Sequence, residues 1–330
     1  MTKIFSIFLF LSIILPINAV SCQVFKMNFP QIQPVMTKTT SLKSKKKHKK
    51  NITRMIIDSQ KNINLEDIKN EISKLIQETE EIYGTDFCTI GFKYKNLKTN
   101  STFGYDTNTP HVSRQVGRIP LMVFLHKLFD ENKLNLDKII KVKEEDISNG
   151  TGNIKYYADL GIFPEYNIRD LISKIMIEHD KTAYNILMNL FGEENLIAYL
   201  SENKLIENEY KFGPDLYLSC NDSMRCLEEL NEIINKKSEF SSLITNNFSR
   251  SRQLYNDKIP AGIDNYQILH NTETAANLKF SSDEAIIPGE YILVIKTTGI
   301  KKSKQASVFR KLSFLINYYH DLENKIESMV

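Results

Sequence analysis

Two short stretches of the sequence carry side chains that could take part in nucleophilic catalysis. His179 stands directly before Asp180, so its imidazole could act as a general base beside a carboxylate. Ser113 lies shortly before Arg118 and Pro120 and offers a hydroxyl that such a base could activate. A polar loop histidine satisfied by its neighbours is the plainer interpretation of His179. The residues by themselves leave both open.

Hydrophobic periodicity predicts the elements that would position these residues. A helix is expected from Asn64, with acidic residues in its first turn and apolar positions recurring at three- and four-residue steps up to Ile82. Two β-rich runs at 87–94 and 102–105, separated by turn residues, predict a hairpin. These elements come before both candidate stretches.

The middle of the chain is predicted to be helical. Pro120 would open the first of these helices, since proline is common at a first helical position, and Gly192 would cap a later one. The predicted helices cover 121–132, 168–177, 182–191 and 222–236.

Strand character returns near the C-terminus, with predicted strands at 266–270, 275–280 and 290–295 and a closing helix at 304–319. Strands grouped at both ends of a helical block predict an α+β fold. We expect a five-stranded antiparallel sheet flanked by helices, with an all-helical lobe at about 115–255 inserted in the α/β lobe.

This order of elements resembles the class A β-lactamase-like branch of the penicillin-recognising serine hydrolases, over roughly residues 64–320. No single motif is decisive, but the order and spacing of three regions make the resemblance specific. The regions are Arg118-Ile119-Pro120-Leu121 with Lys133–Asp137, His179–Leu187, and Ile259–Ile263 leading to His270–Glu273.

The resemblance implies a Ser-x-x-Lys motif at the start of a helix, and this chain departs from it. The lysine position is Arg118, and the serine position three residues earlier is Gln115. Glutamine cannot form an acyl-enzyme, and arginine stays protonated and cannot accept a proton. Ser113 is the alternative nucleophile, but on a helix its two-residue offset turns the side chain by roughly 200° from the pocket.

The other two motifs are also degenerate. The Ser-Asp-Asn positions are His179, Asp180 and Lys181, so only the middle residue matches. The Lys-Thr-Gly positions are Asn271, Thr272 and Glu273. Asn271 replaces the lysine that would bind a substrate carboxylate, and Glu273 is an anion where the motif has glycine. The resemblance implies one candidate pocket formed by the motif positions Gln115, Arg118, His179, Asp180, Lys181, Asn271, Thr272 and Glu273. Arg118 or Lys181 could pair with Glu273 there.

Two further comparisons with the motif pattern bear on activity. Lys296-Thr297-Thr298-Gly299 looks like a Lys-Thr-Gly motif, but only the terminal helix follows it, so we interpret it as a strand-to-helix turn. The general-base glutamate of class A β-lactamases has no clear counterpart between Gly192 and Ser219, where the segment 205–218 looks shorter.

Loss of all three motifs favours a pseudoenzyme, that is, a non-catalytic protein that uses a hydrolase scaffold to bind an envelope ligand or a protein partner. The alternative is an active serine hydrolase, β-lactamase-like or peptidase-like, that uses displaced residues such as Ser113 and His179.

The N-terminus predicts export. Lys3 and the apolar run Ile4–Leu15 have the layout of a signal segment, here 1–22. Cleavage before Cys22 with lipid on its thiol would make a bacterial lipoprotein on the outer side of the cell membrane. Cleavage after Ala19 or Ser21, giving a secreted protein, and an uncleaved anchor are the alternatives.

Residues 23–60 are predicted to be a basic flexible linker, and 61–330 the β-lactamase-like domain. The lysine run 43–50 could attract anionic lipid headgroups or envelope polymers. The formal net charge is only +3, and we expect no nucleic acid as a partner of an exported chain.

The remaining cysteines, Cys88, Cys220 and Cys226, lack the spacing of a metal site. We expect them to be buried small side chains, with a Cys220–Cys226 disulfide as the alternative outside the cell. No metal and no cofactor is predicted.

Overall fold

The computed structural model describes residues 64–112, 118–207, 217–254, 256–275 and 279–329. Residue contacts divide the chain into Met1–Lys61 and Asn62–Val330, and all of the described residues belong to the second unit. The predicted signal segment and the whole predicted linker, with Cys22, therefore lie outside the described residues. Ser113 and Gln115 lie outside them as well.

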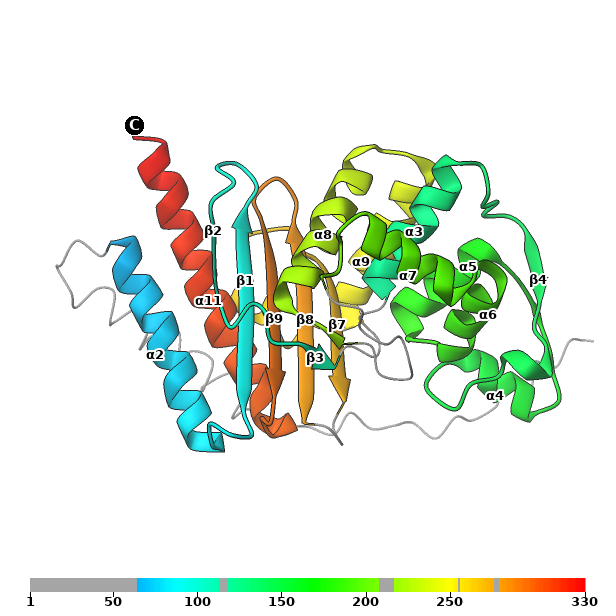
Figure 1. Cartoon of the computed structure of the whole chain (residues 1–330), viewed down its shortest axis with the longest axis horizontal. Helices are drawn as coiled ribbons and strands as arrows, with labels where there is room; N and C mark the ends of the chain where they lie inside the picture. Colours follow the sequence, from blue (N-terminus) through cyan, green and yellow to red (C-terminus); the bar gives the residue numbers. More distant parts are fainter. Residues whose placement is uncertain (1–63, 113–117, 208–216, 255, 276–278, 330) are drawn as a thin grey trace, which may run out of the picture. The chain divides into compact units, whose positions relative to one another are not determined.

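A five-stranded antiparallel sheet runs through the domain in the order β2-β1-β9-β8-β7 (Figure 1). Its register pairs Phe92 with Ile295 and Ser282 with Lys296. The strands are β1 Thr89–Asn96, β2 Thr102–Tyr105, β7 Leu269–Ala275, β8 Phe280–Ile287 and β9 Tyr291–Thr298. The predicted α+β class and five-stranded sheet are confirmed.

Two of the predicted strand positions were wrong. The structure places β7 at Leu269–Ala275 and β8 at Phe280–Ile287, so Ala275 ends one strand and Phe280 begins the next. The reason is that the middle of each strand is polar. Residues 270–273 and 281–284 are buried although they are polar or charged, and hydrophobic patterning does not mark such strands.

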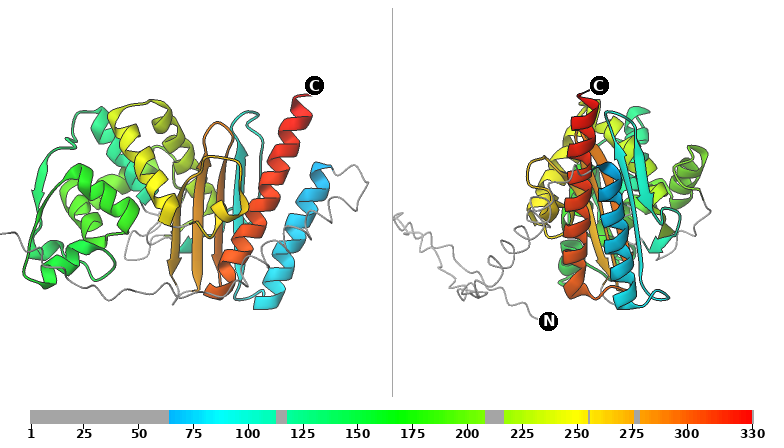
Figure 2. Two further views of the ribbon diagram at one scale, coloured as in Figure 1. Left: turned by 180° about the vertical axis from the view of Figure 1, so that it is seen from behind. Right: turned by 90° about the vertical axis from the view of Figure 1, so that its left-hand side faces the viewer.

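Helices α2 Leu65–Tyr83 and α11 Lys302–Glu327 lie side by side over one face of the sheet (Figure 2). Helix α2 begins where predicted, because Asn64 and Asp67 form a reciprocal capping box, with each backbone N–H donating to the other side chain at 3.0 Å. Helix α11 is longer than the predicted 304–319. Its extra C-terminal turns are held by polar contacts to the sheet.

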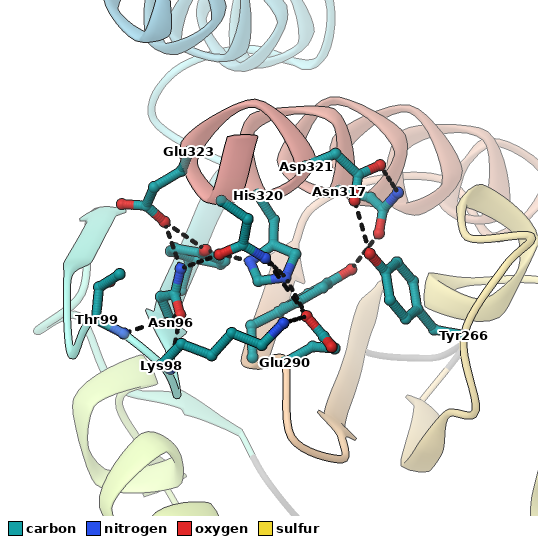
Figure 3. Close-up of polar contacts among 12 residues, drawn as sticks. Asn96, Lys98, Thr99, Tyr266, Glu290, Asn317, His320, Asp321 and Glu323 are labelled. Carbon is teal, nitrogen blue, oxygen red and sulfur yellow. Dashed lines mark hydrogen bonds and ion pairs between the residues drawn. The ribbon is translucent and has the colours of Figure 1, made fainter. Parts of the chain in front are cut away.

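Glu323 is the centre of these contacts (Figure 3). Its carboxylate accepts hydrogen bonds from the Tyr94 hydroxyl at 2.9 Å, from the Asn96 amide at 2.8 Å and from the Ser101 hydroxyl at 2.5 Å. Tyr94 also lies 2.8 Å from Nδ1 of His320. A buried carboxylate with three donors fastens the end of α11 to β1 and the β1–β2 turn.

A second carboxylate continues this cluster toward the turn between β8 and β9. Glu290 lies 3.0 Å from Nε2 of His320 and 2.6 Å from the Lys98 ammonium. The cluster therefore joins the β1–β2 turn and the β8–β9 turn, which lie at the same end of the sheet, to helix α11. It is a structural fastening, remote from the candidate pocket.

The opposite face of the sheet is covered by helix α8 Cys220–Asn235, and α3 Arg118–Asp130 packs against α8. Every residue of α3 from Arg118 to His126 is buried, as expected of a helix surrounded by other helices. The helical part also contains α4 Asn153–Asp159, η1 Glu144–Asp146, α5 Ile168–Ser173, η2 Lys174–Glu178, α6 Lys181–Phe191, α7 Glu193–Glu202 and α9 Glu239–Leu254. The short helix α10 Ile259–Gly262 packs instead against α11 and β8. Two pairs of short antiparallel strands accompany the helical part. β3 His111–Val112 pairs with β6 Tyr217–Leu218, and β4 Ile139–Lys141 pairs with β5 Glu165–Asn167.

Some helix boundaries differ from the predictions. Pro120 is the third described residue of α3 and not its opening residue, a position at which a missing N–H is still harmless. The predicted helix 168–177 is α5 followed by the π-helical turn η2, which ends before His179. Helix α9 was not predicted.

The cysteines of the described region, Cys88, Cys220 and Cys226, are free and buried. Their predicted role as small buried side chains is confirmed, and the alternative Cys220–Cys226 disulfide is not formed. Among the described helices, none combines the length and the apolar character that crossing a bilayer requires.

Candidate functional site

Arg118 joins two of the predicted motif regions. It stands at the start of α3, and its Nη1 donates a hydrogen bond of 3.2 Å to the side-chain oxygen of Asn271 on β7. Both residues are buried. β7 is an edge strand of the sheet, so this bond links the helical part to the sheet edge. The positions of the first and third motifs therefore meet.

His179 brings in the second motif. It follows the π-helical turn η2 in a left-handed conformation, with φ at 59°. Burial, together with the positive charges of Arg118 and Lys258, lowers the pKa of the imidazole to about 2. The ring is therefore neutral at physiological pH. Its pKa is also far below the value that suits a general base near neutrality.

Asp180, the one matching residue of the second motif, has a structural role. It is the N-cap of α6, where one carboxylate oxygen accepts the Ala183 N–H at 3.0 Å. The other oxygen accepts the Ile154 N–H of α4, also at 3.0 Å. A Cβ at Gly152 would lie 2.1 Å from the Asp180 carboxyl carbon, so the loop before α4 must be glycine there. Asp180 holds two helix starts together.

Lys181 lies over the loop before α4. Its backbone N–H donates to the Thr151 carbonyl at 3.1 Å, and a Cβ at Gly150 would meet its Cδ at 2.3 Å. The side chain thus packs on Gly150. Pairing of Arg118 or Lys181 with Glu273 stays a prediction.

Lys258 is the residue of the site that the sequence interpretation missed. Its buried ammonium donates to the Thr272 hydroxyl at 2.5 Å, to the Glu273 carbonyl at 2.5 Å and to the Ser282 carbonyl at 3.1 Å. Three acceptors use all three N–H groups of an ammonium. Two of the degenerate third-motif positions are therefore held by a lysine from outside the motif.

The charge of Lys258 is sensitive to its surroundings. Burial lowers its pKa to about 8, opposed by the carboxylates of Asp283, Asp257 and Glu273. In the sequence, the one feature that points to Lys258 is its position directly before Ile259-Pro260, a pair that contributed to the family resemblance. The family pattern has a cation on the strand itself, a position that is Asn271 in this chain, whereas Lys258 reaches β7 from the chain before α10.

Next to Lys258 lies a buried histidine–aspartate pair on the same strands. Nδ1 of His270 is 2.8 Å from one oxygen of Asp283, whose other oxygen accepts the Ile259 N–H at 2.9 Å. These bonds fix α10 against β7 and β8. In the sequence, His270 was noted only as the residue before the Lys-Thr-Gly positions, which begin at Asn271.

Lys296, the first residue of the Lys-Thr-Thr-Gly stretch, is not part of the junction between Arg118 and Asn271. Its ammonium lies 2.9 Å from Glu284 on β8, and Ser223 of α8 donates to the same carboxylate oxygen at 2.7 Å. Gly299 follows with φ at 84°, and a Cβ there would be 1.9 Å from the Phe87 carbonyl oxygen. The stretch is the end of β9 and a tight turn into α11, as interpreted from the sequence.

The described residues contain no group of three or more His, Cys, Asp or Glu side chains placed to hold a metal ion. The site that the structure does describe is a buried polar junction. Arg118, His179 and Asn271 come from the three motif regions, and Lys258 holds Thr272 and Glu273 beside them. Gln115 and Ser113 lie outside the described residues, as does most of the segment 205–218.

Comparisons with known proteins agree with this architecture. PBP-A is 16% identical, with a TM-score of 0.63, over 76% of this chain and 96% of the other. A beta-lactamase from Sphaerobacter thermophilus is also 16% identical, with a TM-score of 0.64 and the same coverage. A beta lactamase from Xanthomonas campestris is 15% identical, with a TM-score of 0.64, over 78% of this chain and 99% of the other.

At such low identity, these structures show the fold alone. A search of curated proteins finds no match. The sequence model described as "Beta-lactamase enzyme family" matches residues 67–319, which is most of the chain. The chain therefore belongs to the beta-lactamase enzyme family and has the fold of the penicillin-recognising serine hydrolases.

Proposed function

We propose that this protein is an exported, membrane-tethered pseudoenzyme of the beta-lactamase enzyme family, which binds an envelope ligand or a protein partner instead of hydrolysing β-lactams. The observation that carries the proposal is the hydrogen bond from Arg118 to Asn271. These residues occupy the positions at which the family resemblance implies two lysines, one for proton transfer and one for the substrate carboxylate.

The chemistry of the junction supports loss of acyl transfer. A guanidinium stays protonated, so Arg118 cannot take the proton of a nucleophile. The pKa of His179, lowered to about 2, makes its imidazole a poor replacement base. The position of the serine nucleophile is Gln115, which has no hydroxyl to acylate.

The same groups support binding of a ligand with an anionic part. Arg118 donates to a neutral amide oxygen, and Lys258 donates to hydroxyl and carbonyl oxygens. Burial lowers the pKa of His179 most, and the charges of Arg118 and Lys258 lower it further. A carboxylate near His179 would gain from this positive potential. Cell-wall stem peptides with a free C-terminal carboxylate are one class of envelope ligand with this chemistry.

Catalysis is tested with a chromogenic β-lactam and a fluorescent penicillin, with a class A β-lactamase as the positive control. We expect neither hydrolysis nor covalent labelling of the full chain. Labelling that disappears in S113A but persists in S242A, which removes an exposed serine of α9, would establish the alternative, an active hydrolase with displaced residues.

Binding is tested with synthetic stem peptides that carry either a free C-terminal carboxylate or an amide. We expect at least about tenfold tighter binding of the carboxylate form, equivalent to about 1.4 kcal/mol. Equal affinity for both peptides would contradict an anion-binding site. Tethering is tested separately, since C22S should release the protein from the membrane fraction if lipid on Cys22 anchors it.

A further inference from the structure

An exposed apolar tip stands at the end of α4, in the helical part of the domain. We call it the 156–163 loop. Its five large apolar side chains are exposed to 62% at Tyr156, 40% at Tyr157, 59% at Leu160, 52% at Ile162 and 36% at Phe163. Single exposed apolar residues are ordinary on a protein surface, but five within eight residues indicate an interaction site.

The loop has a regular construction. Gly161 adopts φ of 74° and donates its N–H to the Ala158 carbonyl at 2.8 Å, while the Ile162 N–H donates to the Tyr157 carbonyl at 3.0 Å. These two bonds are the Schellman motif that ends many helices, and this motif brings Ile162 beside Tyr157. Tyr156 and Leu160, four residues apart, share a helix face. The five side chains therefore gather on one small projection.

The exposure is not caused by a loosely attached helix. Ile154 in the first turn of α4 is completely buried, and its N–H is held by Asp180. The charges beside the tip are balanced, because Lys155 pairs with Asp159 at 2.8 Å. A projection that is apolar, uncharged and anchored at its base suits insertion into a soft apolar phase better than capture of a charged partner.

We propose that the 156–163 loop inserts into the interfacial region of the lipid bilayer on which the protein is tethered. Two of its five residues are tyrosines, which prefer the boundary between headgroups and acyl chains. The proposal rests on the tethering part of the proposed function. The linker, residues 23–60, can reach on the order of 100 Å when extended, so it lets the loop meet the membrane. Tethering then raises its effective concentration there.

The chain contains no tryptophan, which allows a direct test. The variant I162W places one indole in the loop, and I82W places one on α2, where Ile82 is 76% exposed. Each full chain is reconstituted with vesicles of phosphatidylcholine, with and without phosphatidylglycerol, that contain lipids brominated on the upper acyl chain. We expect at least twofold quenching of indole emission in I162W, with and without the anionic lipid, and little quenching in I82W.

The outcomes separate the loop from the tether. If the chain floats with the vesicles but I162W is quenched no more than I82W, the loop proposal is wrong and the tether stands. A blue shift of I162W without quenching by bromolipid indicates contact with protein, such as a second copy, and also overturns the proposal. Quenching only with phosphatidylglycerol would assign the contact to the linker lysines instead. A chain that does not float at all contradicts both tether and loop, whereas the penicillin-labelling result is independent of either.

Discussion

Two buried lysines on the same sheet have different environments. Lys296 lies on the face that α8 covers and pairs with a carboxylate, that of Glu284. Lys258 lies on the other face, 5.3 Å from the ring centre of Phe309 in α11, and donates only to neutral oxygens. The sequence pattern drew attention to Lys296, yet Lys258 is the lysine beside the candidate pocket.

The difference separates a structural charge from a tuned one. Contact with a carboxylate neutralises the charge of Lys296 locally, so this lysine mainly stabilises the packing of α8 on β8 and β9. Hydroxyl and carbonyl dipoles solvate Lys258, the carboxylates of Asp283, Asp257 and Glu273 also act on its charge, and this charge contributes to the lowered pKa of His179. Together with burial, the charge of Lys296 still lowers the pKa of His111, so the ion pair weakens this charge without abolishing it. The two lysines therefore differ in where their charges act, since only that of Lys258 lies beside the junction of Arg118, His179 and Asn271.

The largest expected effect comes from breaking the closed pair. K296M should lower the free energy of unfolding by about 4 kcal/mol, because Glu284 would remain buried without its partner. Urea denaturation measures this loss, and K304M, which changes an exposed lysine of α11, is the control. The double variant K296M/E284L should recover much of the loss. A K296M protein as stable as K304M would show that the two lysines do not differ as described.

Much of the fold could be predicted from the sequence, because its main elements follow simple rules. The capping residues at Asn64 and the apolar period of α2, β1 and α11 are local signals, and the structure confirms them. The polar strands were placed wrongly. Residues 281–284 are Ser-Ser-Asp-Glu and are buried. Their partners include Ser223 of α8, and Lys258 and Ile259 at the start of α10, which come from other parts of the chain.

The candidate site was predicted only in part for the same reason. Arg118, His179 and Asn271 were found because a family motif fixes their positions along the chain, and the structure brings them together. Lys258 belongs to no motif. Its role depends on how the chain before α10 folds back over β7 and β8, which spacing along the sequence does not encode.

The second prediction concerns the pH dependence that Lys258 confers. Its pKa is lowered to about 8 in the folded protein, from an ordinary value near 10.5. The unfolded chain therefore binds more protons between these values, and stability rises as the pH rises through this window. Relative to K258M, the wild-type protein should gain roughly 2 kcal/mol between pH 7.5 and 9.5. Parallel pH dependence of the two proteins would mean that the charge of Lys258 is as well neutralised as that of Lys296.

The third prediction uses His179, whose pKa is lowered first by burial and then by the positive charges of Arg118 and Lys258. Because that pKa is lowered to about 2, the folded protein keeps the ring neutral while the unfolded chain becomes protonated as the pH falls below 6.5. Stability from this group is complete above pH 6.5 and declines toward pH 2. Between pH 7 and 5, wild type should lose about 1.9 kcal/mol more than H179N. Asparagine suits the left-handed conformation at this position, so the variant should fold.

The smallest expected effect tests the neutral solvation of Lys258 itself. T272V removes the hydroxyl that accepts from the Lys258 ammonium and donates to the Ser282 carbonyl, and should cost about 1 kcal/mol in unfolding free energy. T274V makes the same substitution at an exposed position of β7 and is the matched control. The loss should shrink at pH 9.5, where Lys258 is mostly neutral and needs its acceptors less. If T272V costs the same at pH 7.5 and 9.5, the hydroxyl supports packing alone, and Lys258 is no more tuned by its neighbours than Lys296.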